Sequence, residues 1–278
     1  MVGSAVTRHM ISQGHAVGRL VRKEPGAGEV RWDPEAGTIN AAGLEGFDGV
    51  VQVASMPWPM RWTAKSKKQM YDNRIRTNRL LAESLAGCKL KPRVLVCASG
   101  MGFYPSSGDQ VITENSPGGT SFLANLQRDG EAATTPASAA GIRVVHLRIP
   151  PVLAKAGIQR GTSWMGGGSQ WMSWIGRDEL ASIVLHVLGT EALVGPVNPV
   201  SPNPVRNADF AAITARVLGR KTGPALPALF LRLLLGEMAD EFALASRRIE
   251  PRRLLDSGYQ FRFPELEDAL RHELAAES

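Results

Sequence analysis

The sequence is poor in the residues that build cross-linked or metal-bound scaffolds. Its 278 residues include two cysteines, Cys88 and Cys97, and five histidines scattered without metal-ligand spacing. Two cysteines, one of them inside an apolar run, make neither a disulfide framework nor a zinc site. We therefore expect free thiols, a reducing compartment and no bound metal.

Long apolar runs and a secretion signal are also lacking. No apolar stretch approaches the roughly 20 residues that span a bilayer, and the best, Ala228 to Leu235, contains Arg232. Residues 1–13 carry polar and charged side chains where a secretory signal is apolar. These absences predict no membrane partner and a cytoplasmic protein, with an organelle interior left open.

The residues that are present are typical of a globular chain. Apolar residues make up 44% and charged residues 21% of the sequence, which excludes a disordered tail. The net charge of +6 suits an anionic small molecule as well as a polyanion. Basic residues gather between Lys65 and Arg79, but on one helical pattern with few aromatics. A solvated helix face is therefore favoured over a nucleic-acid site.

Short β-rich runs alternate with longer amphipathic stretches. Val50-Val51-Gln52-Val53 and Val94-Leu95-Val96 are typical of strands buried on both faces. The alternation predicts an α/β fold, a doubly wound parallel sheet of the Rossmann type. We expect strands over residues 16–21, 49–54, 93–98, 142–147 and 197–200, and helices over residues 3–13, 63–86, 121–139 and 178–188.

The pattern changes after about residue 200. Asn207 is a good N-cap for a helix over residues 208–218, which Gly219 would close. An apolar helix over 229–235 and a final helix over 264–274 follow. We predict a sheet domain over residues 1–200 and a small, mostly helical C-terminal domain over 201–278 that covers the mouth of the sheet.

Open parallel sheets bind ligands beyond the carboxyl ends of their strands. Gly3 and Ser4 begin the first helix, whose N-terminus can hold a pyrophosphate, although one glycine is a weak match to a glycine-rich fingerprint. Arg22 follows the next strand, where a basic residue suits the 2′-phosphate of NADP. A solvated arginine at a strand end is an equally good interpretation.

A loop of small residues follows the strand over residues 93–98. It carries Ser99, whose hydroxyl can polarise a carbonyl, and Tyr104, which can exchange a proton. A structural glycine-rich turn with a packed aromatic is the commoner alternative. Further on, Trp171 and Trp174 either line a cleft or seal two parts of the molecule together.

Eight ordered motifs together resemble the YfcH-like epimerase family of atypical extended short-chain dehydrogenase/reductase proteins, over residues 1 to about 274. The resemblance implies an NADP(H)-binding Rossmann domain, an oxidoreductase or epimerase-like activity on an unidentified small molecule, and a C-terminal domain of unsettled role. The motifs are VRWDP (30–34), LEGFD (44–48), RWTA (61–64), SGMGFY (99–104), TENSP (113–117), QWMSWI (170–175), NPVRN (203–207) and LLLGEM (233–238). The cofactor-binding residues implied are Gly3, Ser4, Arg22, Ala54, Ser55 and Arg74, and the catalytic residues are Ser99 and Tyr104.

The chain departs from this family at its start and in its catalytic helix. Val2-Gly3-Ser4 corresponds to the tail of a strand and a glycine-rich loop. The Tyr-x-x-x-Lys pair of extended enzymes falls on Leu123 and Gln127, a tryptophan falls on Gly130, and a histidine falls on Gly176.

The missing strand would be central, and its absence would leave unpaired backbone groups on two neighbours. Either Met1 is not the biological start, which is the alternative we favour, or the sheet closes over a damaged nucleotide site. The alternative function is a catalytically inactive nucleotide-binding or interaction module. The sequence leaves the oligomeric state open.

Overall fold

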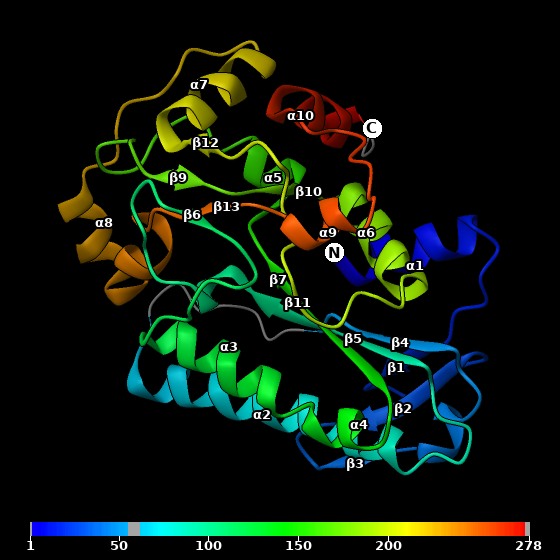
Figure 1. Ribbon diagram of the computed structural model, residues 1–278. Coiled ribbons are helices and arrows are strands. Elements are labelled where there is room, and N and C mark those ends of the chain that lie inside the picture. Colours follow the sequence, from blue (N-terminus) through cyan, green and yellow to red (C-terminus); the bar gives the residue numbers. More distant parts are fainter. Residues whose placement is uncertain (1, 55–61, 276–278) are drawn as a thin grey trace.

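A four-stranded parallel sheet forms the centre of the computed structural model, which describes residues 2–54 and 62–275 (Figure 1). The longest ladder joins the two middle strands, in a register that places Ser99 beside Arg148. The strands are, in spatial order, β11 (Gly195–Val197), β7 (Arg143–Ile149), β5 (Val94–Gly100) and β4 (Gly49–Gln52).

A second, smaller sheet lies at the β4 side of the central sheet. Its first two strands are parallel and its last two are antiparallel. Leu20 and Val30 of this sheet and Val50 of β4 pack on the same apolar cluster, so the two sheets share one layer. The strands are β1 (Arg19–Val21), β2 (Glu29–Asp33) and β3 (Thr38–Ile39).

The two sheets remain separate. Within the residues that the structure describes, β1 pairs with β2 and β4 pairs with β5, and no ladder joins β1 to β4. A closed sheet, the less favoured of the two alternatives drawn from the sequence, is therefore not what the structure contains among the described residues.

Helices cover both faces of the central sheet (Figure 1). The residues of β5 show this by alternation: Val94 and Val96 pack in one apolar cluster with α1 and α6, and Leu95 and Cys97 pack in another with α2 and α4. The doubly wound fold predicted from the sequence is confirmed. The first face carries α1 (Val2–Ser12) and α6 (Arg177–Gly189), and the second carries α2 (Ala64–Ala86), α3 (Phe122–Ala132) and α4 (Thr135–Ala139).

One helix prediction and one N-cap prediction differ from the structure, and the other helices agree with their predicted ranges to within about two residues. The helix predicted over residues 121–139 is broken, since α3 ends at Ala132 and Pro136, which has no N–H to donate, lies in the first turn of α4. The N-cap predicted at Asn207 is wrong. The cap position is Arg206, and the Asn207 side chain instead accepts a hydrogen bond of 2.6 Å from the amide of Met165.

The region beyond residue 200 is mostly helical, as predicted. Earlier segments pair with it: Trp171 lies opposite Arg206, and Val111 lies opposite Arg248. The domain boundary at residue 200 stays a prediction. The helices are α7 (Asn207–Val217), α8 (Ala228–Leu235), a π-turn (Ala239–Ala243), α9 (Arg252–Asp256) and α10 (Leu266–Ala275), with α5 (Lys155–Ile158) packed nearby.

Short strand pairs tie the earlier segments to this region. Each involves strands of two residues, so they position loops and add little sheet. The pairs are β6 (Val111–Ile112) with β13 (Arg248–Ile249), β8 (Val152–Leu153) with β10 (Ile175–Gly176), and β9 (Trp171–Met172) with β12 (Val205–Arg206).

Candidate functional site

The N-terminus of α1 lies against the chain that leaves β4. A Cβ atom added at Gly3 would lie 3.4 Å from Cγ2 of Val53, so a small residue brings the helix end close to this strand. Ser4 is exposed in the same turn. A helix N-terminus at the carboxyl edge of a parallel sheet presents free amide groups and a positive dipole end, which suits a phosphate.

Arg22 and Ala54 are exposed at this carboxyl edge, just beyond β1 and β4. Arg22 forms no ion pair with any residue that the structure describes, whereas its neighbour Lys23 has its Nζ 3.8 Å from the Glu29 carboxylate. The guanidinium of Arg22 is therefore available to an anion. Ser55, the next predicted cofactor residue, lies outside the described residues.

Arg74 reaches from α2 to the end of β5. Its Nη1 donates a hydrogen bond of 2.8 Å to the Ala98 carbonyl, and burial lowers the pKa of its guanidinium. Gly130 of α3 makes room for it, because a Cβ atom there would lie 2.8 Å from Cγ of Arg74. Among the described residues no carboxylate pairs with Arg74. A half-buried cation without a carboxylate favours an anionic ligand nearby.

Ser99 belongs to a buried ion-pair cluster. Its hydroxyl donates a 2.6 Å hydrogen bond to Oε1 of Glu131 in α3. Arg148 of β7 holds the same carboxylate with two nitrogens, Nε to Oε1 at 3.0 Å and Nη2 to Oε2 at 2.9 Å. Ser99 and Arg148 meet Glu131 because their register and the strand alternation place both side chains on the face that α3 covers.

This cluster changes the chemistry expected of Ser99. Its one proton is directed to Glu131, so the oxygen presents lone pairs to any ligand and acts as a hydrogen-bond acceptor. Polarising a carbonyl, as predicted from the sequence, would require the hydroxyl to turn away from the carboxylate. Sequence reasoning did not identify Glu131 and Arg148 as part of the site. The available signal was a charged residue, Arg148, within a strand buried on both faces.

The side chain of Tyr104 is enclosed by other residues of the protein. Its side chain is fully buried, its hydroxyl donates to Oδ1 of Asn198 at 2.9 Å, and it accepts a hydrogen bond from Nη1 of Arg148 at 2.9 Å. Burial raises the pKa of the phenol. A tyrosine that exchanges protons with a substrate needs an accessible hydroxyl and a lowered pKa. Tyr104 has neither, so the structure does not support the proton-donor role expected from the sequence.

The two positions of the absent tyrosine–lysine pair are also buried. Leu123 packs in an apolar cluster with Trp62 and Met70. Gln127 lies beside Ser99, with its Oε1 3.4 Å from the serine oxygen. An amide does not titrate, so Gln127 can hold a ligand group by hydrogen bonds but cannot supply a proton.

The two tryptophans have different surroundings. Trp174 is buried with Leu266 and Leu270 of α10, so it seals the C-terminal region to the rest of the molecule. Trp171 is half-exposed, and the guanidinium of Arg206 lies 4.1 Å from its ring centre. The sequence left open whether the tryptophans line a cleft or seal two parts of the molecule together. Trp174 has the sealing role.

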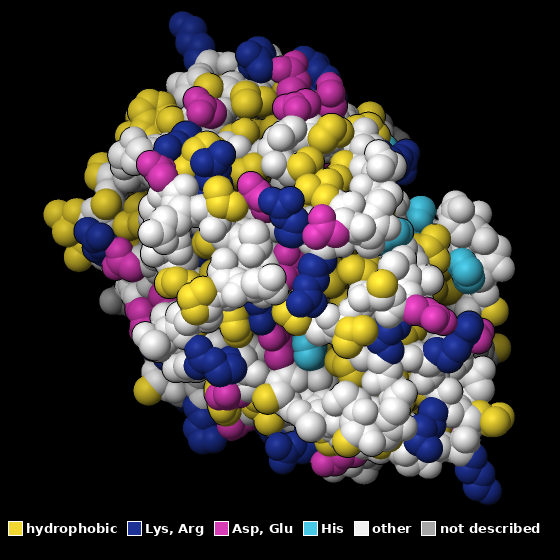
Figure 2. Space-filling view, viewed as in Figure 1, with side chains coloured by type: hydrophobic (Ala, Val, Ile, Leu, Met, Phe, Trp, Pro, Cys, Tyr) yellow, Lys and Arg dark blue, Asp and Glu magenta, His cyan; other side chains and the backbone are white. Residues whose placement is uncertain are grey.

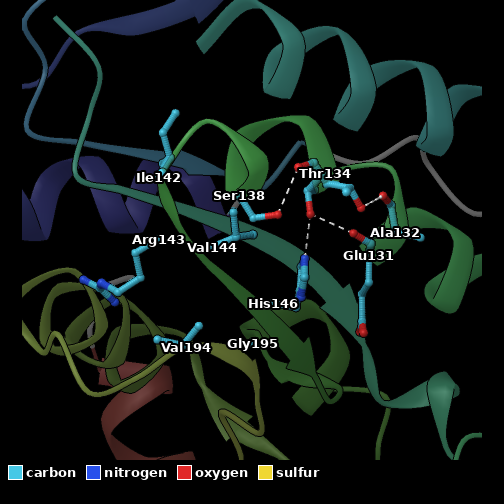
Figure 3. Close-up of a pocket in the computed structure, with 12 residues that line it drawn as sticks. Glu131, Ala132, Thr134, Ser138, Ile142, Arg143, Val144, His146, Val194 and Gly195 are labelled. Carbon is cyan, nitrogen blue, oxygen red and sulfur yellow. Dashed lines mark hydrogen bonds between the residues drawn. The ribbon is translucent and has the colours of Figure 1, made fainter. Parts of the chain in front are cut away.

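A separate open cavity of about 650 Å³ lies between α4, β7 and β11 (Figure 3). Thr134 donates a 2.7 Å hydrogen bond to the Glu131 carbonyl, so its oxygen accepts from Nε2 of His146 at 2.9 Å. Burial lowers the pKa of His146, which favours the neutral ring. The cavity lies beside the first half of β7, away from the carboxyl edge, and the sequence analysis did not predict it.

Two classes of site have no counterpart in the part of the chain that the structure describes. No group of three or more histidine, cysteine, aspartate or glutamate residues there could hold a metal ion. No helix in that part is long and apolar enough to cross a bilayer.

Comparison with known proteins adds close relatives. A family model described as a domain of unknown function, DUF1731, matches residues 226–273. The curated epimerase family protein ML0860 of Mycobacterium leprae is 34% identical, over 98% of this chain and 92% of the relative. The epimerase family protein SDR39U1 of Homo sapiens is 31% identical, over 99% and 96%.

Solved structures that are similar to this chain are also of epimerase proteins. The crystal structure of the human SDR39U1 protein (isoform 2) with NADPH matches with a TM-score of 0.85 and 29% identity, over 99% of this chain and 96% of that chain. A nucleoside-diphosphate sugar epimerase from Corynebacterium glutamicum matches with a TM-score of 0.82 and 33% identity, over 99% of this chain and 56% of that chain.

Proposed function

This chain belongs to the epimerase family of atypical short-chain dehydrogenase/reductase proteins, and from that premise we propose that it binds NADP(H) and performs an oxidoreductase or epimerase-like reaction on a small molecule. The observation that carries the proposal is the pair of cations without carboxylate partners among the described residues, Arg22 and Arg74, at the edge where this fold binds nucleotides. The human relative of the same fold was crystallised with NADPH.

The residues present fit such a cofactor. In this proposal the first turn of α1, with Gly3 and Ser4, faces the pyrophosphate, and Arg22 faces the 2′-phosphate. Ala54 lies along the cofactor, Arg74 adds positive charge behind it, and Ser55, outside the described residues, stays a predicted member of this site. When bound, NADP(H) supplies hydride chemistry.

The protein's own contribution is to orient the ligand. Ser99 accepts a hydrogen bond from a hydroxyl or amide group of the ligand, and Glu131 fixes the direction of the serine proton. Arg148 holds the Glu131 side chain in place with two nitrogens. This arrangement draws no proton from Tyr104. The family relation does not favour the alternative of an inactive module, but that alternative remains a possible outcome of the test.

The test compares the affinity for NADPH with that for NADH by the fluorescence of the reduced nicotinamide. We expect Arg22→Ala to weaken NADPH binding roughly tenfold and to leave NADH binding unchanged, because it removes one charge-assisted contact to the 2′-phosphate. Arg19→Ala is the matched control. Arg19 lies on the same strand but pairs with Glu29 at 2.5 Å, so its loss should not change the ratio.

A screen of carbonyl compounds for NADPH consumption then separates the outcomes. Turnover of any compound supports the proposal. Binding without turnover across the screen supports the inactive module, and an absence of NADPH binding contradicts both.

A further inference from the structure

The first turn of α3 is capped by a side chain from the region that matches DUF1731. The first backbone N–H groups of a helix have no partner within the helix itself. In α3 the amide of Phe122 donates to Oε1 of Glu241 at 3.2 Å, and the amide of Leu123 donates to Oε2 at 3.1 Å. Glu241 lies in the π-turn, 119 residues after Phe122. Figure 1 places this turn beside the start of α3.

The same carboxylate orients the serine that caps the helix. Oγ of Ser121 accepts a hydrogen bond of 3.3 Å from the amide of Ala124 and donates its own proton to Oε2 of Glu241 at 2.8 Å. The amide of Asn125 makes the first regular helical bond, to the Ser121 carbonyl. The N–H groups of residues 122–124 therefore all have partners, and a negative charge lies at the N-terminus of the helix, where it is favourable.

Arg247 fixes the other side of Glu241. Its side chain is buried, and its Nη1 donates to the Glu241 carbonyl at 2.9 Å. Its Nε donates to the Tyr104 carbonyl at 2.8 Å, in the loop that follows β5. We call residues 241–247 the capping segment. The capping segment thus bonds to the start of α3 on one side and to the loop after β5 on the other.

These two attachments lie on either side of the candidate site. The hydroxyl of Ser99, near the end of β5, lies 3.4 Å from Oε1 of Gln127 and 2.6 Å from Oε1 of Glu131. Both partners belong to α3, one and two turns beyond the capped residues. Gly130 of the same helix lies against the side chain of Arg74. A shift of α3 relative to β5 would therefore move several groups of the candidate site together.

We propose that Glu241 is a positioning residue, through which the DUF1731 region holds α3 against β5 in the geometry that the ligand requires. The inference rests on the proposed function. It gives a role to a region whose matching family model is described as a domain of unknown function. The π-turn is consistent with this role, because such turns are rare and occur frequently at functional sites.

Glu241→Ala tests the proposal, because it leaves the first amides of α3 without their acceptors. We expect amide exchange in α3, measured by mass spectrometry without nucleotide, to rise roughly tenfold or more, since hydrogen bonds to a charged group are lost. Exchange in β5 and β7 should stay the same. The affinity for NADPH, measured by fluorescence, should weaken roughly fivefold because α3 moves.

Two further measurements check the cause. Glu241→Gln keeps one acceptor oxygen, so its exchange and its affinity should lie between those of the wild type and Glu241→Ala. Sodium acetate should restore the NADPH affinity of Glu241→Ala, since it supplies a carboxylate to the vacant cap. Sodium chloride at the same concentration should not restore it.

Asp240→Ala is the matched control. Asp240 precedes Glu241 in the same turn, but it pairs with Arg232 of α8 through Oδ1 and Nη2 at 2.9 Å, and both side chains are half-exposed. Figure 2 shows charged side chains of both signs at the edge of the molecule where Figure 1 places α8. The loss of this surface pair should change neither the exchange of α3 nor the affinity for NADPH.

The outcomes separate this inference from the proposed function. Unchanged exchange of α3 in Glu241→Ala overturns the positioning role. Faster exchange of α3 with unchanged NADPH affinity also overturns it, because Glu241 would then serve only the stability of the helix. A wild-type chain that does not bind NADPH overturns the proposed function, and the positioning role with it.

Discussion

Arg148 and Arg74 lie near the carboxyl end of β5, on β7 and α2, yet their surroundings differ. Arg148 holds the Glu131 carboxylate with two nitrogens and packs its guanidinium 3.4 Å from the ring centre of Phe103. Within the described residues, the guanidinium of Arg74 donates one hydrogen bond, to the backbone carbonyl of Ala98. The comparison teaches that a fully paired buried charge belongs to the architecture, whereas a partly paired one at a ligand-binding edge is available for recognition.

The largest effect on stability is expected from replacing Arg148, the arginine that is paired with a buried carboxylate. Arg148→Met leaves Glu131 buried without its cation and removes a donor to Tyr104. Because an uncompensated buried charge is costly, we expect a loss of about 3–5 kcal/mol in the free energy of unfolding, measured with urea.

A second variant checks the cause. Adding Glu131→Gln to Arg148→Met removes the stranded charge and should restore part of the loss. If the double variant is as unstable as the sum of the two single variants, the stranded carboxylate is not the reason.

Arg74, which has no carboxylate partner among the described residues, should affect NADPH binding more than stability. Arg74→Ala strands no carboxylate among the described residues and removes one hydrogen bond to the Ala98 carbonyl, so its effect on stability should be smaller than that of Arg148→Met. Loss of one positive charge near the phosphates should weaken NADPH binding roughly tenfold, which is about 1.4 kcal/mol. Fluorescence titration and urea unfolding of the same preparation measure both. A large loss of stability with unchanged affinity would assign Arg74 to the architecture instead.

Tyr104→Phe separates a structural role of the Tyr104 hydroxyl from a catalytic one. The variant keeps the ring but leaves Oδ1 of Asn198 without its donor, so we expect a loss of about 1–3 kcal/mol in stability. Turnover of any substrate found should be unchanged, since the hydroxyl is buried and already hydrogen-bonded. Turnover that falls while the unfolding curve stays the same would return Tyr104 to the catalytic mechanism.

The smallest effect is a pH dependence of stability that comes from His146, which lies on the same strand as Arg148. Burial lowers the pKa of His146 in the folded state, so the unfolded chain binds the extra proton first. The contribution of His146 to the free energy of unfolding should therefore be fully present above the unfolded pKa of about 6.5. It should be lost as the pH falls toward the lowered pKa of the folded state.

The difference between wild type and His146→Gln isolates this slope. Burial also raises the pKa values of Glu114 and Glu273, and these carboxyls contribute the opposite slope in both proteins. Unfolding curves measured from pH 7.5 to 5 should converge for the two proteins as pH falls. Parallel curves would contradict a lowered pKa of His146.

The fold was largely predictable because its strongest signals are local. The strand β5 is buried on both faces, so its sequence is an uninterrupted apolar run, and Thr63 and Ser66 form a capping box at the start of α2 as the predicted boundary required. The break between α3 and α4 was missed because Pro136 is compatible with the first turn of a new helix as well as with a loop.

The site was less predictable because its determinants are distant in sequence. Ser99, Glu131 and Arg148 belong to three elements, and no spacing rule connects them. The burial of Tyr104 depends on Asn198, nearly a hundred residues later. A motif can therefore place a hydroxyl at the end of a strand, but the packing of later segments decides whether that hydroxyl can reach a ligand.

The separation of β1 from β4 has a consequence for motion. A sheet of three short strands, which packs on the core through Leu20, Val30 and Ile39, shares no ladder with β5 or β7 among the described residues, so we expect it to open before that ladder does. Its amide hydrogens should then exchange with solvent earlier than those of β5. Since Arg22 follows β1, an anion held by this arginine would restrain the opening, and the exchange rate of this small sheet would become a measure of ligand occupancy.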